Sequence, residues 1–166
     1  MERSRPVSSL VIGGTGMLAE ATRWMCRHHP PTLLVARRAS AFAGGAPDLV
    51  ALDLDWLRSD FAPRIAEAVG TPSRVVKALI WLHEPVRLLG RLSPLLPPAG
   101  TVIVLGSMGG RPAVPVGADH AAIVRLGSKP TPGGRRWLTH AEISAGAIAA
   151  LRDGRSRIVG DLAPAG

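Results

Sequence analysis

The sequence predicts a doubly wound α/β fold, in which helices cover both faces of a parallel β-sheet. Three observations support this fold class. Several short segments are apolar at almost every position, which is typical of strands buried on both faces of a sheet. Segments with helical periodicity alternate with these strands along the chain. A glycine-rich turn, Gly13-Gly14-Thr15-Gly16, separates the first strand from the first helix.

Apolar runs locate the strands. Ser9-Leu10-Val11-Ile12 is the first run, and Thr101-Val102-Ile103-Val104-Leu105-Gly106 is a later and longer one. Runs of four to eight apolar residues that end at turn residues are consistent with fully buried strands. The predicted strands comprise residues 9–12, 33–36, 49–52, 75–82, 101–106 and 122–126, and residues 158–159 are a further candidate.

Helical spacing and capping signals locate the helices. Phe61, Ile65 and Val69 follow one another at intervals of four, which places them on one face of a helix. Thr139 and Glu142 have the spacing of a capping box, in which each side chain binds the other residue's backbone N–H. The predicted helices comprise residues 17–28, 57–69 and 85–96, and a last helix that opens at the capping box and continues through Leu151. Residues 128–136 are predicted to form a polar loop.

Composition favours one soluble domain over residues 1–166, with a short C-terminal extension over about 111–166. The 166 residues include 46% hydrophobic and 19% charged residues, in the range of globular proteins. The single cysteine excludes a disulfide framework and a cysteine-based zinc site. Histidine, aspartate and glutamate show no metal-ligand spacing, so we expect no metal. No apolar segment reaches the ~18 residues of a membrane span. We expect a cytoplasmic protein without a membrane partner.

The formal net charge of +8 raises the question of a nucleic-acid partner. The arginines are scattered along the chain, however, and aromatic residues make up only 4% of it. No nucleic-acid-binding motif accompanies the charge. We therefore expect no nucleic-acid partner. A positive cleft for a phosphorylated small molecule accounts better for the charge.

The glycine-rich turn predicts a dinucleotide site. Residues 14–19, GTGMLA, fit the pattern G-x-G-x-x-G/A between a strand and a helix. On this alignment Gly14 allows the tight turn, Gly16 lets a pyrophosphate approach the backbone, and Ala19 lets helix and strand pack closely. The alternative is a tight turn that is rich in glycine for structural reasons. The predicted phosphate-binding residues are Gly13, Gly14, Thr15, Gly16, Met17 and Leu18.

Two arginines after the second strand indicate which dinucleotide is bound. Sites that prefer NAD place a carboxylate about 20 residues after the glycines, where it holds the ribose 2′-hydroxyl. This chain has Arg37 and Arg38 there instead. A guanidinium can grip a 2′-phosphate with two parallel hydrogen bonds. We therefore predict NADP(H), the alternative being that both arginines belong to a solvated loop.

With these features the chain resembles the short-chain dehydrogenase/reductase family over about its first 110 residues. The resemblance rests on VIGGTGMLA at residues 11–19, Asp53-Leu54, the end of the fourth strand, and the strand that ends at Ser107. It implies a Rossmann fold and an oxidoreductase in which Asp53 contacts adenine. At the end of the fourth strand, Leu82-His83 replaces the family's Asn-Ala-Gly. The cofactor-binding residues that the resemblance adds are Asp53, Leu54, Leu82, His83, Gly106 and Ser107.

Compared with the family it resembles, the chain lacks one catalytic group. Family members pair a serine such as Ser107 with Tyr-x-x-x-Lys, but this chain contains no tyrosine. His120 lies near the position expected for the tyrosine, and histidine has an ordinary pKa of about 6.5 that suits proton transfer. Ser107 and His120 are therefore the candidate catalytic residues. The alternatives are that His120 is an exposed loop residue and that Ser107 only lines the cofactor site.

Three functions follow from these residues. The first is an atypical NADP(H)-dependent oxidoreductase that acts on a small carbonyl, hydroxyl or imine-type substrate. The second is a non-catalytic NADP(H)-binding sensor or subunit of a complex. The third, a basic protein associated with nucleic acid, is the least favoured. An uncovered sheet edge near the C-terminus would also suit a homo-oligomer.

Overall fold

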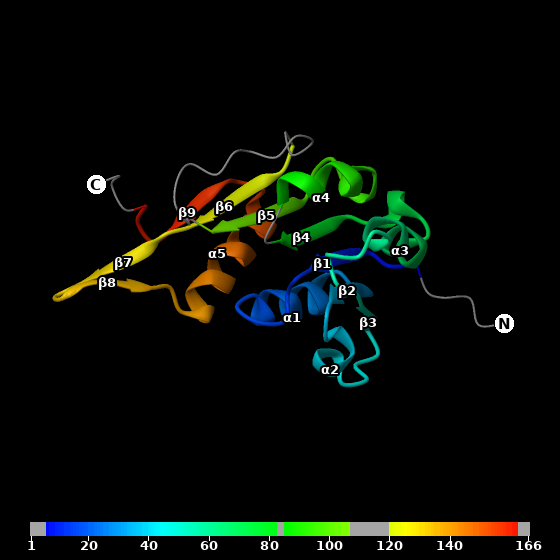
Figure 1. The fold of residues 1–166 in the computed structure, drawn as a ribbon, viewed down its shortest axis with the longest axis horizontal. Helices are drawn as coiled ribbons and strands as arrows, with labels where there is room; N and C mark the ends of the chain where they lie inside the picture. Colours follow the sequence, from blue (N-terminus) through cyan, green and yellow to red (C-terminus); the bar gives the residue numbers. More distant parts are fainter. Residues whose placement is uncertain (1–5, 83–84, 107–119, 163–166) are drawn as a thin grey trace.

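In the computed structural model, which describes residues 6–82, 85–106 and 120–162, seven parallel strands form one sheet (Figure 1). The strand order is β3-β2-β1-β4-β5-β6-β9. The chain therefore winds in one direction from β1 to β3 and in the other from β4 onward, which confirms the doubly wound Rossmann-type fold. The strands are β1 (Ser9–Ile12), β2 (Thr32–Ala36), β3 (Leu49–Asp53), β4 (Lys77–Trp81), β5 (Thr101–Gly106), β6 (Ala122–Leu126) and β9 (Arg157–Val159).

Helices cover both faces of this sheet (Figure 1). On one face α3 and α4 pack through residues such as Ile65 and Leu89, and on the other α1 and α5 pack through residues such as Met25 and Leu151. Neighbouring residues of β1 divide between the two cores, as the alternation of side chains along a strand requires. The helices are α1 (Ala19–His28), α2 (Ala39–Ala43), α3 (Phe61–Val69), α4 (Pro85–Leu92) and α5 (His140–Asp153).

The predicted strands agree with the structure to within two residues at each end, whereas three predicted helices differ at one end. Helix α1 begins at Ala19 rather than Met17, because the glycine-rich turn continues to Leu18. Helix α3 begins four residues later than predicted. Helix α4 ends at Leu92 and is followed by a 3-10 turn at Ser93–Leu95, where Pro94 has no N–H to continue the helical ladder. The short helix α2 was not predicted.

Residues 128–137 are a β-hairpin and not the predicted loop. The strands β7 (Ser128–Thr131) and β8 (Gly134–Trp137) pair antiparallel and project from the body of the domain (Figure 1). All of β8 is exposed, so its sequence lacks the alternation that would have predicted a strand. The predicted C-terminal extension also contributes β6 and β9 to the main sheet.

Charged groups fix the hairpin to the start of α5. The Glu142 carboxylate accepts hydrogen bonds from Arg136 and from the Thr139 backbone N–H, and it forms an ion pair with Lys129. The Thr139 hydroxyl accepts in turn from the Glu142 N–H, which confirms the predicted capping box. The guanidinium of Arg136 and the ammonium of Lys129 hold the pKa of Glu142 far below its ordinary value.

Acid should therefore weaken this junction through Glu142. Its pKa is lower in the folded chain than in the unfolded chain, so its contribution to stability is present above the unfolded pKa of about 4.3 and is lost as the pH falls toward the folded value. Other carboxylates whose pKa is lowered in the folded chain also make its stability fall in acid. We expect Glu142→Gln to unfold at a lower temperature than wild type at pH 7, and the difference to shrink below pH 4. Thermal unfolding measures both proteins across this pH range. A difference in unfolding temperature that stays constant would contradict the role given to the Glu142 carboxylate.

Along the described segments, no helix is long and apolar enough to cross a membrane.

Candidate functional site

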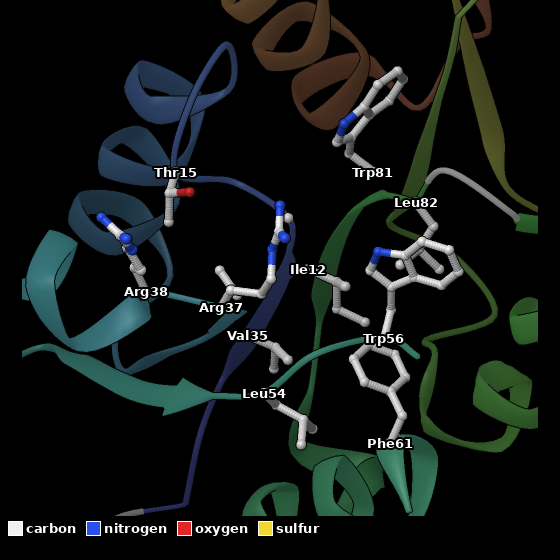
Figure 2. Close-up of a pocket in the computed structure, with 12 residues that line it drawn as sticks. Ile12, Thr15, Val35, Arg37, Arg38, Leu54, Trp56, Phe61, Trp81 and Leu82 are labelled. Atoms are coloured by element: carbon white, nitrogen blue, oxygen red, sulfur yellow. The ribbon is translucent and has the colours of Figure 1, made fainter. Parts of the chain in front are cut away.

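A cavity of about 600 Å³ opens at the carboxyl ends of the central strands (Figure 2). It lies where the strand order reverses between β1 and β4, the position at which open α/β sheets bind ligands. We call it the first cavity. Figure 2 shows two arginines on one side of it and an aromatic and aliphatic wall on the other. The lining residues are Ile12, Gly13, Thr15, Val35, Ala36, Arg37, Arg38, Leu54, Trp56, Phe61, Trp81 and Leu82.

Each glycine of the turn meets a different constraint. Gly13 has a φ of +78°, and a Cβ there would overlap the carbonyl oxygen of Trp81. A Cβ on Gly14 would overlap the side chains of Thr22 and Val11, and the Thr22 hydroxyl donates a 2.7 Å hydrogen bond to the Gly14 carbonyl. Gly16 has open space where its Cβ would be. The positive φ that the tight turn requires is therefore at Gly13, one residue before Gly14, where it was predicted. Gly14 provides a close contact between helix and strand, and the contact expected of Ala19 stays a prediction.

The turn also presents backbone donors. Among described residues, the N–H groups of Thr15, Gly16 and Met17 have no hydrogen-bond acceptor. They lie at the N-terminal end of α1, where the helix dipole favours negative charge. Open space at Gly16 lets a ligand reach these donors. The arrangement fits an anionic group such as a phosphate.

Helix α5 holds the turn in place. The Ser144 hydroxyl donates a hydrogen bond to the Met17 carbonyl at 3.0 Å and accepts one from the Ala21 N–H at 3.3 Å. The N-cap residue of α1, Leu18, has no polar side chain, so Ser144 satisfies one of the N–H groups that the helix leaves unpaired. Ser144 is 1% exposed, which makes this a buried link between α5 and the glycine-rich turn.

Arg37 and Arg38 follow β2 and line the first cavity. Both are exposed, and within the described part of the chain neither guanidinium has a hydrogen bond or ion pair. Figure 2 shows Arg37 extending between Thr15 and Trp81, and Arg38 lying closer to α1. The cavity thus carries two positive charges that no described side chain neutralises.

Asp53 lies at the end of β3 but does not line the first cavity. Its carboxylate accepts hydrogen bonds from the backbone N–H and the hydroxyl of Ser40, at 2.8 and 2.7 Å. These bonds hold the pKa of Asp53 below its ordinary value. The carboxylate therefore anchors the first turn of α2, and the adenine contact expected from the family resemblance stays a prediction.

The remaining predicted residues divide between two cavities and the core. Leu54 and Leu82 line the first cavity, while Met17 and Gly106 line a neighbouring one. Leu18 is fully buried, so its side chain belongs to the core. His120 is exposed and lines neither cavity. The predictions for Ser107 and His83 fall outside the described residues.

Aromatic residues of the site were missed. Trp56 follows β3 and Trp81 ends β4, so both lie at the carboxyl edge of the sheet and line the first cavity, together with Phe61. From the sequence we assigned these tryptophans no role at the site. Trp81 lies near the carboxyl end of a predicted strand and Trp56 shortly after another, and this position was the signal that could have placed them at the site.

A second cavity, of about 290 Å³, lies beside the first at the same edge of the sheet. Trp81 lines both cavities. Residues from the ends of β4, β5 and β6, from the glycine-rich turn, from the hairpin strand β8 and from the start of α5 line this cavity, which is open to solvent on one side. Its lining residues are Met17, Trp81, Gly106, Leu126, Gly127, Trp137, Leu138, His140 and Ile143.

Within the described residues, no three or more histidine, cysteine or acidic side chains come together in a group that could hold a metal ion.

Solved structures provide the comparison with known proteins, since no protein-family model and no curated protein matches the sequence. A short-chain dehydrogenase from Burkholderia cenocepacia J2315, solved in complex with NADP, superimposes with a TM-score of 0.61 at 13% identity, covering 95% of this chain and 89% of that one. An oxidoreductase of the short-chain dehydrogenase/reductase family from Burkholderia thailandensis gives 0.58 at 15% identity, covering 95% and 92%. The chain therefore has the fold of the short-chain dehydrogenase/reductases.

Proposed function

We propose that the protein binds NADP(H) in the first cavity and is an oxidoreductase of the short-chain dehydrogenase/reductase type. The proposal rests mainly on one observation, that two groups of phosphate-binding donors line the same cavity. The glycine-rich turn offers unpaired backbone N–H groups, and Arg37 and Arg38 offer two guanidinium groups without a described partner. These features suit a molecule with phosphates at two separate points. One structural neighbour was solved with NADP.

The residues present fit such a cofactor. The N–H groups of Thr15 and Gly16 would bind the pyrophosphate at the start of α1. Arg37 and Arg38 would hold the 2′-phosphate with charge-assisted hydrogen bonds. The apolar wall that includes Leu54 and Phe61 would suit the flat face of adenine. When bound, the nicotinamide would supply or accept a hydride at the substrate carbon.

The substrate in this proposal is a small carbonyl, hydroxyl or imine-type compound. Ser107 would keep its predicted role of orienting the substrate oxygen, and His120 is the candidate that the sequence offers for exchanging its proton. The sequence contains no tyrosine and so lacks the family's usual catalytic group, which favours a second candidate function, a non-catalytic sensor of NADP(H) or a subunit of a complex. A panel of substrates assayed with NADPH separates the two candidates, because only the oxidoreductase would turn a substrate over.

Removing both arginines should abolish the preference for NADPH over NADH. We expect wild type to bind NADPH more tightly than NADH, and Arg37→Ala/Arg38→Ala to weaken NADPH by about ten- to a hundred-fold while changing NADH little. The reason is that a hydrogen bond to a charged group contributes about 1.5–3 kcal/mol. Isothermal titration calorimetry with both nucleotides measures the effect.

A matched variant controls for net charge. Arg74→Ala/Arg91→Ala removes two exposed arginines that do not line the first cavity, so it should leave NADPH affinity within about twofold of wild type. Equal affinity of the wild type for NADPH and NADH, or an equal loss of NADPH binding in both double variants, would defeat the assignment of Arg37 and Arg38.

A further inference from the structure

The second cavity has walls of a different chemistry from those of the first. Trp81, Trp137, Met17 and three aliphatic side chains surround it, and His140 is the titratable residue among those that line it. Ligand cavities are usually apolar with a few placed polar groups. At about 290 Å³, this one lies at the lower limit of the usual range of roughly 300–1,000 Å³. It suits a small, flat, apolar molecule with one hydrogen-bonding oxygen.

The position of the second cavity connects it with the first. Met17 belongs to the glycine-rich turn, Gly106 ends β5, and Trp81 lines both cavities. Figure 2 shows the Trp81 ring directed away from the aromatic wall of Trp56 and Phe61. A molecule in the second cavity would therefore lie beside one end of a molecule that fills the first.

His140 is held at this cavity by its helix. It is the first residue of α5, directly after the N-cap Thr139. Ser144 lies four residues further along, on the same side of the helix, and binds the Met17 carbonyl. The ion pairs of Glu142 with Arg136 and Lys129 fix the same turn against the hairpin. His140 therefore projects from a turn that is anchored at two points, whereas the alternative candidate, His120, lines neither cavity.

We propose that the second cavity binds a small aromatic or apolar carbonyl compound and that His140 donates the proton to its oxygen. The proposal rests on the proposed function. When bound, the reduced nicotinamide would supply the hydride to the carbonyl carbon, and the imidazolium of His140 would give the proton to the oxygen. The product is an alcohol, and the neutral imidazole regains its proton from water. His140 thereby takes the role that the sequence had suggested for His120.

Binding is tested first, without nucleotide, using acetophenone as an apolar probe and dihydroxyacetone as a polar one. We expect acetophenone, but not dihydroxyacetone, to give saturation-transfer NMR signals. His140→Ala should weaken acetophenone about two- to tenfold, the worth of one hydrogen bond, and His140→Gln should restore it because the amide still donates. His28→Ala removes an exposed histidine that lines neither cavity, so it is the matched control and should change nothing. Because His140 is exposed, its variants should fold as wild type does.

Turnover is tested next, as oxidation of NADPH by acetophenone. Both His140→Ala and His140→Gln should lower kcat by about 10²–10⁴-fold, because neither side chain can deliver the proton. Wild-type kcat in either variant, or no turnover by wild type although both molecules bind, would overturn the role of His140. Failure of acetophenone to bind while NADPH binds would overturn the cavity assignment alone. Failure of NADPH to bind would instead overturn the proposed function.

Discussion

Gly13→Ala should strongly destabilise the fold, whereas Gly16→Ala should leave its stability unchanged. Gly13 has a φ of +78°, a conformation that costs an alanine about 1–2 kcal/mol. Its Cβ would also overlap the carbonyl oxygen of Trp81, which is backbone and cannot rotate away. Such overpacking costs about 1–3 kcal/mol more. We expect a loss of about 2–5 kcal/mol in the free energy of unfolding, measured with denaturant.

Gly16 is the control in the same turn. It has an ordinary φ and nothing within 4 Å of its ideal Cβ, so alanine there has room in the folded chain. The proposed function adds a second expectation. A methyl group at Gly16 would stand where the pyrophosphate approaches the backbone, so NADPH affinity should fall although stability does not. Equal denaturation midpoints for the two variants would show that the turn is not held as the structure describes.

The strands could be predicted from the sequence because the sheet is buried on both faces. A strand such as β5 is apolar along its length and ends at turn residues, so its bounds follow from composition alone. The hairpin of β7 and β8 had no such signal, since neither of its strands contributes to the core. Its pairing and its ion pairs with Glu142 depend on contacts that only the folded chain brings together.

The site was predictable to the extent that it depends on local sequence. The glycine-rich turn and Arg37-Arg38 each follow a strand directly, and the parallel sheet brings them to one cavity. The different steric constraints on Gly13 and Gly14 could not be predicted. They come from Trp81 and Thr22, which contact the turn from other parts of the fold. The same reason explains why the sequence alone does not single out His140. Its place at the second cavity depends on the docking of α5 against α1 through Ser144.

Leu79→Ala should remove about 2–5 kcal/mol from the free energy of unfolding, the usual cost of emptying a buried leucine site. Leu79 is fully buried in β4, at the centre of the sheet, and packs with the core beneath α1 and α5. It lies two residues before Trp81 and so on the same face of the strand. Leu57→Ala makes the same truncation at a residue that is 71% exposed and should cost less than about 0.5 kcal/mol. Urea unfolding of both variants measures the difference, and similar losses would mean that β4 is not at the centre of the core.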